Sequence, residues 1–232
     1  SHSSMCGHQF DPVQIVLTKK QSIRITGTLP FAWKNQRGLY TDTLIITESS
    51  IKAPLSWQML PAFFFYLAAM IDDKISEKKQ AIFLAEDGMD KMLEGRGDFL
   101  PNITKMALNK LSKNKNGFFL MVEGAQIDWG GHDNDTDYLI TELLDFDKTI
   151  GVALDFAAKN TETLVIVTAD HETGGFTLAT DDGNYNKIKP TFSTGGHSAT
   201  MVPIFAKGPG EENFGGIYKN TALFQKMMDI FK

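Results

Sequence analysis

The sequence predicts an α/β protein, a three-layer sandwich with a largely parallel central sheet. Three short apolar runs, at 118–122, 164–168 and 201–206, alternate with segments whose apolar residues recur at helical spacing. Runs of this length without polar interruption are typical of strands that are covered on both faces. Helices between and after the runs would supply that cover.

Three amphipathic helices are expected around these strands. The first begins near Pro101, because proline and asparagine suit a helix start, and it ends before Gly117. The second has apolar residues at every third or fourth position, namely Leu139, Leu143, Phe146, Ile150, Leu154 and Ala157. The third begins near Asn220 and carries Leu223, Phe224, Met227 and Phe231.

The regular pattern starts near residue 80, so we divide the chain into a less regular segment, 1–79, and a domain, 80–232. In the first part, residues 21–28 and 42–47 are candidate strands. Several prolines interrupt any steady alternation of strands and helices there. The sequence assigns no role to this segment.

Composition and charge narrow the class of function. Hydrophobic residues make up 42% and charged residues 22% of the 232 positions, which is typical of a globular protein. The formal net charge of -5 provides no basic field, so no nucleic-acid partner is expected. The longest apolar run, 59–71, is shorter than the roughly 20 residues that cross a bilayer, so no membrane partner is expected either. The single cysteine, Cys6, excludes an internal disulfide.

Carboxylates and imidazoles lie where the predicted strands meet their loops, which is where ligand sites form in open α/β sheets. In chain order they are Glu123, Asp128, His132, Asp170, His171 and His197. This ligand set suits zinc and similar divalent ions in hydrolytic sites. Each group alone also fits a surface carboxylate, a hydrogen-bonded turn or a strand-end pair, and it is their joint occurrence that favours metal binding. We therefore predict that the six side chains converge at one rim of the molecule.

Longer motifs resemble the alkaline phosphatase family. They are LSKNKNGFFLMVEGAQIDWGGHDND at 111–135, TLVIVTADHETGG at 163–175, TGGHSATMVPIFAKGPG at 194–210 and FGGIYKNTALFQKM at 214–227, with a weaker match at 81–98. The similarity covers residues 80–232 and leaves 1–79 as a poorly matched amino-terminal segment. It implies the α/β fold of that family in incomplete form, as a carboxy-terminal portion.

The resemblance also implies a phosphomonoester hydrolase that uses two zinc ions and one magnesium ion. Its partners would be small phosphomonoester substrates and inorganic phosphate, its location periplasmic or secreted, and a homodimer stays open. By motif position, the ligands would be Asp128, His132 and His197 for the first zinc, Asp170 and His171 for the second, and Glu123 for magnesium.

The nucleophile of that family is not recognisable in this sequence. The family mechanism uses a serine within an Asp-Ser-Ala segment, and no Asp-Ser dipeptide occurs anywhere in the chain. The arginines, Arg24, Arg37 and Arg96, do not lie in the context of the phosphate-binding arginine. The catalytic residues therefore stay unknown. Three functions remain open: a metal-dependent phosphomonoesterase, a non-catalytic metal-binding module or inactive fragment, and a diesterase or sulfatase relative.

Overall fold

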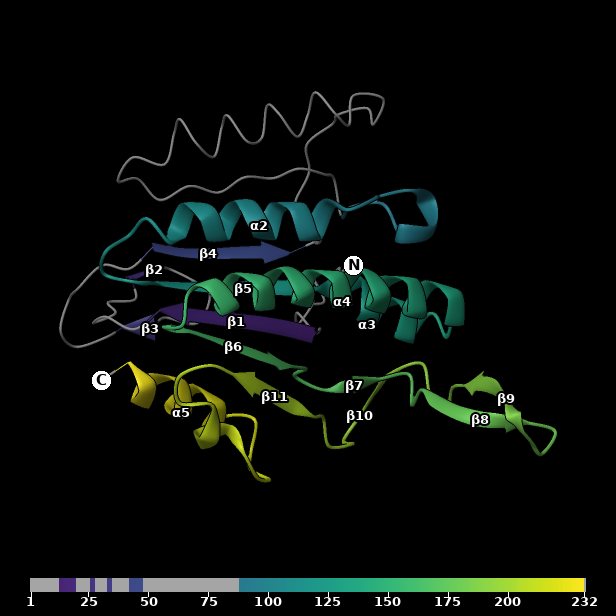
Figure 1. Ribbon diagram of the computed structural model, residues 1–232. Helices are drawn as coiled ribbons and strands as arrows, with labels where there is room; N and C mark the ends of the chain where they lie inside the picture. The colour runs from purple at the N-terminus through teal and green to yellow at the C-terminus, as the bar shows by residue number, and fades with distance from the viewer. Residues whose placement is uncertain (1–12, 20–25, 28–32, 35–41, 48–87, 232) are drawn as a thin grey trace, which may run out of the picture.

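The computed structural model describes residues 13–19, 26–27, 33–34, 42–47 and 88–231 of the chain (Figure 1). For the part before residue 88, only the strands and their pairing are described. The candidate strand at 21–28 falls mostly outside the described residues, and 42–47 forms a strand as expected.

A five-stranded sheet forms the centre of the fold. Its strand order is β11-β6-β1-β5-β4. The bounds, in that order, are Ile204–Lys207, Thr163–Thr168, Val13–Lys19, Phe118–Gly124 and Asp42–Thr47. Three two-stranded pairs accompany the sheet: β7 (Glu172–Thr173) with β10 (His197–Ser198), β8 (Thr177–Asp181) with β9 (Asn184–Thr191), and β2 (Thr26–Gly27) with β3 (Trp33–Lys34).

The α/β class is confirmed, whereas the strand pairing differs from the largely parallel sheet that was expected. Among the described strands of this sheet, β4 and β5 pair in parallel, but β1 runs antiparallel to both β5 and β6, and β11 runs antiparallel to β6. Two of these antiparallel pairings arise because β1, which the sequence reading did not identify, lies between β5 and β6, and the third arises because β11 runs against β6. As a result, β4, β5 and β6 still point the same way, and the ends of β5 and β6 meet at one edge.

The two parts of the chain share this sheet. β1 and β4 come from the segment 1–79, and they pair with β5 and β6 of the domain 80–232. The boundary between the two parts stays a prediction.

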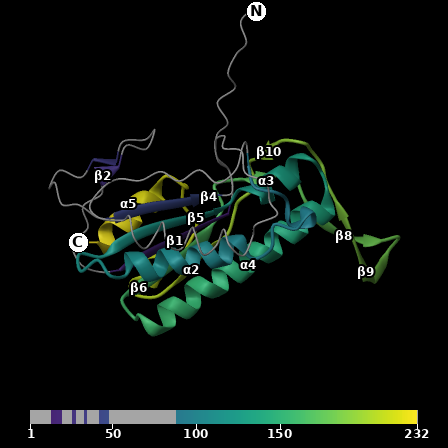
Figure 2. The same ribbon diagram turned by 90° about the horizontal axis from the view of Figure 1, so that it is seen from above.

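Helices cover both faces of the sheet (Figure 2). They are α2 (Phe99–Leu111), α3 (Ala125–His132), α4 (Thr136–Lys159) and α5 (Ala222–Ile230), with short 3-10 turns η2 (Met92–Glu94) and η3 (Glu211–Phe214). α2 and α4 pack on one face and α5 on the other. Side chains of β5 and β6 alternate between these layers, because successive residues of a strand point to opposite faces: Phe118 and Val165 face α2 and α4, whereas Phe119 and Leu164 face α5.

The buried face of α4 differs from the one that helical spacing predicts. Leu143 and Leu154 are 44% and 40% exposed, whereas Glu142 and Asp145 are only 2% and 1% exposed. The acidic side chains point inward because they meet a buried arginine, Arg96, which lies in the loop before α2. The packed face of α4 therefore includes two acidic side chains and is not purely apolar.

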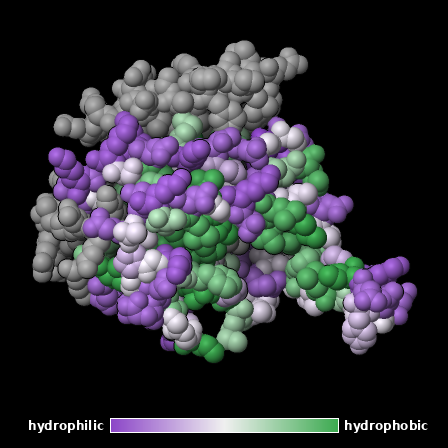
Figure 3. Space-filling view, in the orientation of Figure 1, coloured by the Kyte–Doolittle hydropathy of each residue, from purple (hydrophilic) through white to green (hydrophobic). Residues whose placement is uncertain are grey.

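The hairpin of β8 and β9 projects from the body of the molecule (Figures 1 and 3), and its tip is hydrophilic.

Among the described residues, none of the helices combines the length and the apolar character that a membrane crossing requires.

Candidate metal centre

α3 begins directly where β5 ends, and this junction brings Asp128 and His132 to the edge of the sheet. Gly124 makes the tight junction feasible, since a Cβ at this position would lie 2.7 Å from Cδ2 of Phe146. Asp128 and His132 lie four residues apart on α3, so their side chains share one face of the helix. Asp128 lies in the first turn of α3, and His132 is its last residue.

Asp128, His132 and His197 form a compact cluster of candidate ligands. His132 Nε2 lies 2.9 Å from His197 Nε2 and 3.4 Å from Asp128 Oδ2, and His197 Nε2 lies 3.6 Å from Asp128 Oδ1. One ligand atom of each residue lies within 4.8 Å of the others. Two imidazole nitrogens and a carboxylate oxygen at this spacing form a donor set that suits zinc.

A backbone carbonyl selects the form of His132 that can bind a metal. His132 Nδ1 lies 2.8 Å from the carbonyl oxygen of Gly195, which can only accept a hydrogen bond. The neutral ring therefore carries its proton on Nδ1, and Nε2 presents a lone pair to the cluster. A second partner of this kind is the usual companion of a metal-binding histidine. The donor set and this hydrogen bond fit a zinc ion.

Asp170 and His171, the other strand-end pair, lie beside this cluster. The His171 ring stacks on the His197 ring with centroids 3.7 Å apart, and Asp170 Oδ2 lies 3.5 Å from His171 Nε2. The pairing of β7 with β10 explains the contact, because it sets His197 opposite Thr173 just after the Asp170-His171 pair.

Glu123 lies at the same edge of the sheet and is 2% exposed. In the strand register, Gln14 of β1 pairs with Glu123 on one side and with Thr168 on the other. Glu123 and Thr168 are thus level with each other, two strand spacings or about 10 Å apart. Five of the six predicted side chains are therefore linked by direct contacts, whereas Glu123 is placed by the strand register alone, level with Thr168 at the end of β5.

Sequence reasoning missed two residues that hold the cluster together. The hydroxyl of Thr173 donates a hydrogen bond to Asp128 Oδ1 and lies 3.3 Å from His171 Nδ1, so it bridges the two groups of candidate ligands. Glu172 accepts hydrogen bonds from the backbone N–H of Phe176, at 3.1 Å, and from the hydroxyl of Ser198. Their position directly after Asp170 and His171 was the available signal, since metal ligands are usually hydrogen-bonded by further polar groups.

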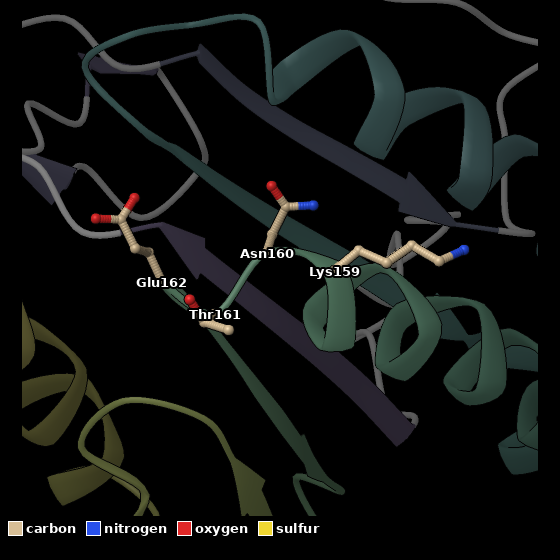
Figure 4. Close-up of a pocket in the computed structure, with 4 residues that line it drawn as sticks. All are labelled: Lys159, Asn160, Thr161 and Glu162. Carbon is tan, nitrogen blue, oxygen red and sulfur yellow. The ribbon is translucent and has the colours of Figure 1, made fainter.

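A separate hollow lies between the carboxyl end of α4 and β6, lined by Lys159, Asn160, Thr161 and Glu162 (Figure 4). The candidate ligands adjoin the opposite end of α4, where Gly130 of α3 packs on Leu139. A helix of 24 residues is about 36 Å long, so the hollow is remote from the ligand cluster.

A family model for alkaline phosphatase matches residues 70–191, just over half of the chain. The chain belongs to the alkaline phosphatase family. Alkaline phosphatase 3 of Bacillus subtilis is 48% identical over an alignment that covers 64% of this chain and 47% of that protein. Alkaline phosphatase 4 of the same organism is 41% identical, with 77% and 54% covered. The chain thus spans about half the length of these relatives.

Solved structures of the family share the fold. The alkaline phosphatase from the Antarctic bacterium TAB5 superposes with a TM-score of 0.65 at 45% identity, over 82% of this chain and 52% of that one. A variant of the TAB5 enzyme, with a TM-score of 0.66 at 37% identity over 82% and 72%, is described with Mg bound in its M3 site. The relatives are thus phosphatases, and a variant of one of them holds a metal ion.

Proposed function

We propose that this chain is the metal-binding, carboxy-terminal part of a zinc- and magnesium-dependent phosphomonoester hydrolase of the alkaline phosphatase type. The observation that carries the proposal is the convergence of Asp128, His132 and His197, with His171 stacked on the same group. Membership of the family supplies the reaction class, because its members named above are phosphatases.

Two zinc ions and one magnesium ion are the proposed cofactors. We assign Asp128, His132 and His197 to one zinc, Asp170 and His171 to the second, and Glu123 to magnesium. Bound ions of this kind would stabilise the charge that develops on phosphoryl oxygens during hydrolysis.

The chain's own residues prepare this centre. The Gly195 carbonyl keeps Nε2 of His132 available, and the Thr173 hydroxyl orients Asp128. The side chains of His132 and His197 are each 39% exposed, so an ion and a small substrate can reach them from solvent.

The proposed substrates are small phosphomonoesters, with inorganic phosphate as the product. By family resemblance we also propose a periplasmic or secreted location, with a homodimer as the assembly to test by light scattering. The nucleophile stays unassigned, because the chain contains no Asp-Ser dipeptide.

Elemental analysis of the purified chain tests the metal proposal. We expect bound zinc in the chain and reduced zinc in the His132→Ala and His197→Ala variants. The Asp98→Asn variant is the matched control, because this exposed carboxylate pairs only with Lys148 among its described ion-pair partners. Absence of zinc from the chain, or equal zinc in all variants, would refute the proposal.

A non-catalytic metal-binding module is the second candidate, and the absent Asp-Ser dipeptide favours it. Losing a nucleophile commonly costs several orders of magnitude in rate. A chromogenic aryl phosphate at alkaline pH separates the two candidates: turnover that a chelator abolishes supports the enzyme, and zinc binding without turnover supports the module. An aryl diester tested in parallel identifies a diesterase.

A further inference from the structure

A buried cluster of one arginine and two carboxylates lies between α4 and the loop before α2. Arg96, Glu142 and Asp145 are 1%, 2% and 1% exposed. Arg96 Nη2 donates to Glu142 Oε2 and, at 3.2 Å, to Asp145 Oδ2. The two acids lie three residues apart on α4, so one guanidinium serves two successive turns of the helix.

The cluster fixes the loop before α2 on the surface of α4. Arg96 Nη1 donates to the Asp90 carbonyl at 3.2 Å, and the backbone N–H of Met92 donates to Glu142 Oε1 at 2.8 Å. Both ends of the 90–96 segment are therefore bound to the same buried ion pairs. Burial raises the pKa of Glu142 and of Asp145, because a carboxylate loses its hydration in the interior.

The same loop is bound to α3, the helix that carries Asp128 and His132. Gln126 Nε2 donates to the Met89 carbonyl at 2.8 Å, and the hydroxyl of Tyr138, in the first turn of α4, donates to Gln126 Oε1 at 2.9 Å. Gln126 is fully buried and lies two residues before Asp128. Gln126 Nε2 also donates to the Asp90 carbonyl at 3.5 Å, the same carbonyl that Arg96 binds, so hydrogen bonds lead from Arg96 to the start of α3.

Stability alone gives a weak reason for this arrangement. Well-packed apolar side chains of similar volume often stabilise a core as much as a buried ion pair does, because ions lose their hydration on burial. Apolar side chains, however, do not fix the orientation of the segments that they join, because they form no directional hydrogen bonds. We propose that Arg96, held by Glu142 and Asp145, positions the start of α3 and thereby sets the affinity of the Asp128–His132–His197 cluster for zinc. The inference rests on the proposed function of that cluster as a zinc site.

Zinc titration of the full chain, by competition with a chromophoric chelator, tests the inference. We expect Arg96→Met to weaken zinc binding by about tenfold, the scale known for groups that orient metal ligands. Arg96→Lys keeps the positive charge but not the planar guanidinium, so its zinc affinity should lie between those of the unaltered chain and of Arg96→Met. Tyr138→Phe removes one hydroxyl with little change in packing, and we expect about a threefold loss of zinc affinity, below the tenfold scale, because Tyr138 acts on α3 only through Gln126.

A matched control separates positioning from general destabilisation. Met227→Ala truncates a buried side chain of α5, on the other face of the sheet. It should lower the unfolding midpoint yet leave zinc affinity within about twofold. Equal zinc affinities for Arg96→Met and Met227→Ala would overturn the inference. If Arg96→Met does not fold, unchanged zinc affinity in Tyr138→Phe overturns it.

One further variant distinguishes the two proposals. If His132→Ala does not weaken zinc binding, the proposed function fails and the inference fails with it. If His132→Ala weakens zinc binding but Arg96→Met and Tyr138→Phe do not, only the positioning role of Arg96 is refuted.

Discussion

The imidazole of His171 stacks on that of His197, with ring centroids 3.7 Å apart and planes inclined by 23°. One ring follows β6 and the other precedes β11, and the β7–β10 pair brings them together. Neutral imidazole is the form that binds a metal ion. The stack therefore joins the two predicted zinc groups into one centre.

Loss of one histidine of the stack is expected to remove one of two zinc ions. His171→Ala should leave about one zinc per chain, because the Asp128–His132–His197 cluster keeps all its ligand atoms. The double variant, in which His197 is also replaced by Ala, should retain less than one. Elemental analysis after dialysis measures both. Full zinc content in His171→Ala would show that this residue is not a ligand.

Thr173 provides a test of the contact between the two ligand groups. Thr173→Val keeps the shape of the side chain but removes the hydroxyl that donates to Asp128. We expect zinc affinity to fall by about tenfold, and the free energy of unfolding to fall by about 1 kcal/mol.

The control for this change is Thr177→Val, which removes a nearby hydroxyl whose partner is the Gly175 carbonyl. Its zinc affinity should match that of the unaltered chain. The bridging role is contradicted if isothermal titration with zinc gives the same affinity for both valine variants.

Much of the fold and of the candidate site could be predicted from local sequence patterns. Strands β5 and β6 are evident because both of their faces are buried, which gives uninterrupted apolar runs. The candidate ligands could be found because they lie at or just after the ends of β5 and β6 and shortly before β11 in the sequence. In both cases the physical cause acts on neighbouring residues.

Features that depend on distant partners could not be predicted in this way. The partners of Arg96 lie 46 and 49 positions further along the chain, so no local pattern marks it as buried. The place of β1 between β5 and β6 depends on pairing across more than a hundred residues. Thr173 resembles any turn hydroxyl until β7 and α3 are brought together.

The buried carboxylates predict how stability depends on pH. Burial raises the pKa of Asp145 above its ordinary 3.8 and that of Glu142 above its ordinary 4.5. The folded state then binds more protons than the unfolded state, so the free energy of unfolding should fall as pH rises from about 4 through the raised pKa values. Asp145→Asn removes one of these groups and should flatten the decline by about 1.4 kcal/mol for each unit of raised pKa.

Urea unfolding of the metal-free chain at about pH 5 and about pH 8 measures this effect without the pH dependence of zinc binding. Thr149→Val serves as the control, since it alters a buried hydroxyl that contacts Asp145 but adds or removes no titratable group. It should change stability by the same amount at both pH values. A pH dependence for Asp145→Asn as steep as that of the unaltered chain would contradict the prediction.

Gly130 and Gly151 should respond in opposite directions to the same substitution. A Cβ at Gly130 would lie 2.7 Å from the backbone nitrogen of Leu139, where α3 packs on α4, and the backbone cannot move aside as a flexible side chain would. We expect Gly130→Ala to lower the free energy of unfolding by about 1–3 kcal/mol. Gly151 lies inside α4 with open space at its Cβ position, so Gly151→Ala should raise stability by about 0.5–1 kcal/mol. The change in the unfolded chain is the same in both variants, so a difference in their denaturation midpoints reports on the close approach of the two helices. Chemical denaturation measures both midpoints. Equal shifts would show that α3 and α4 do not pack this closely.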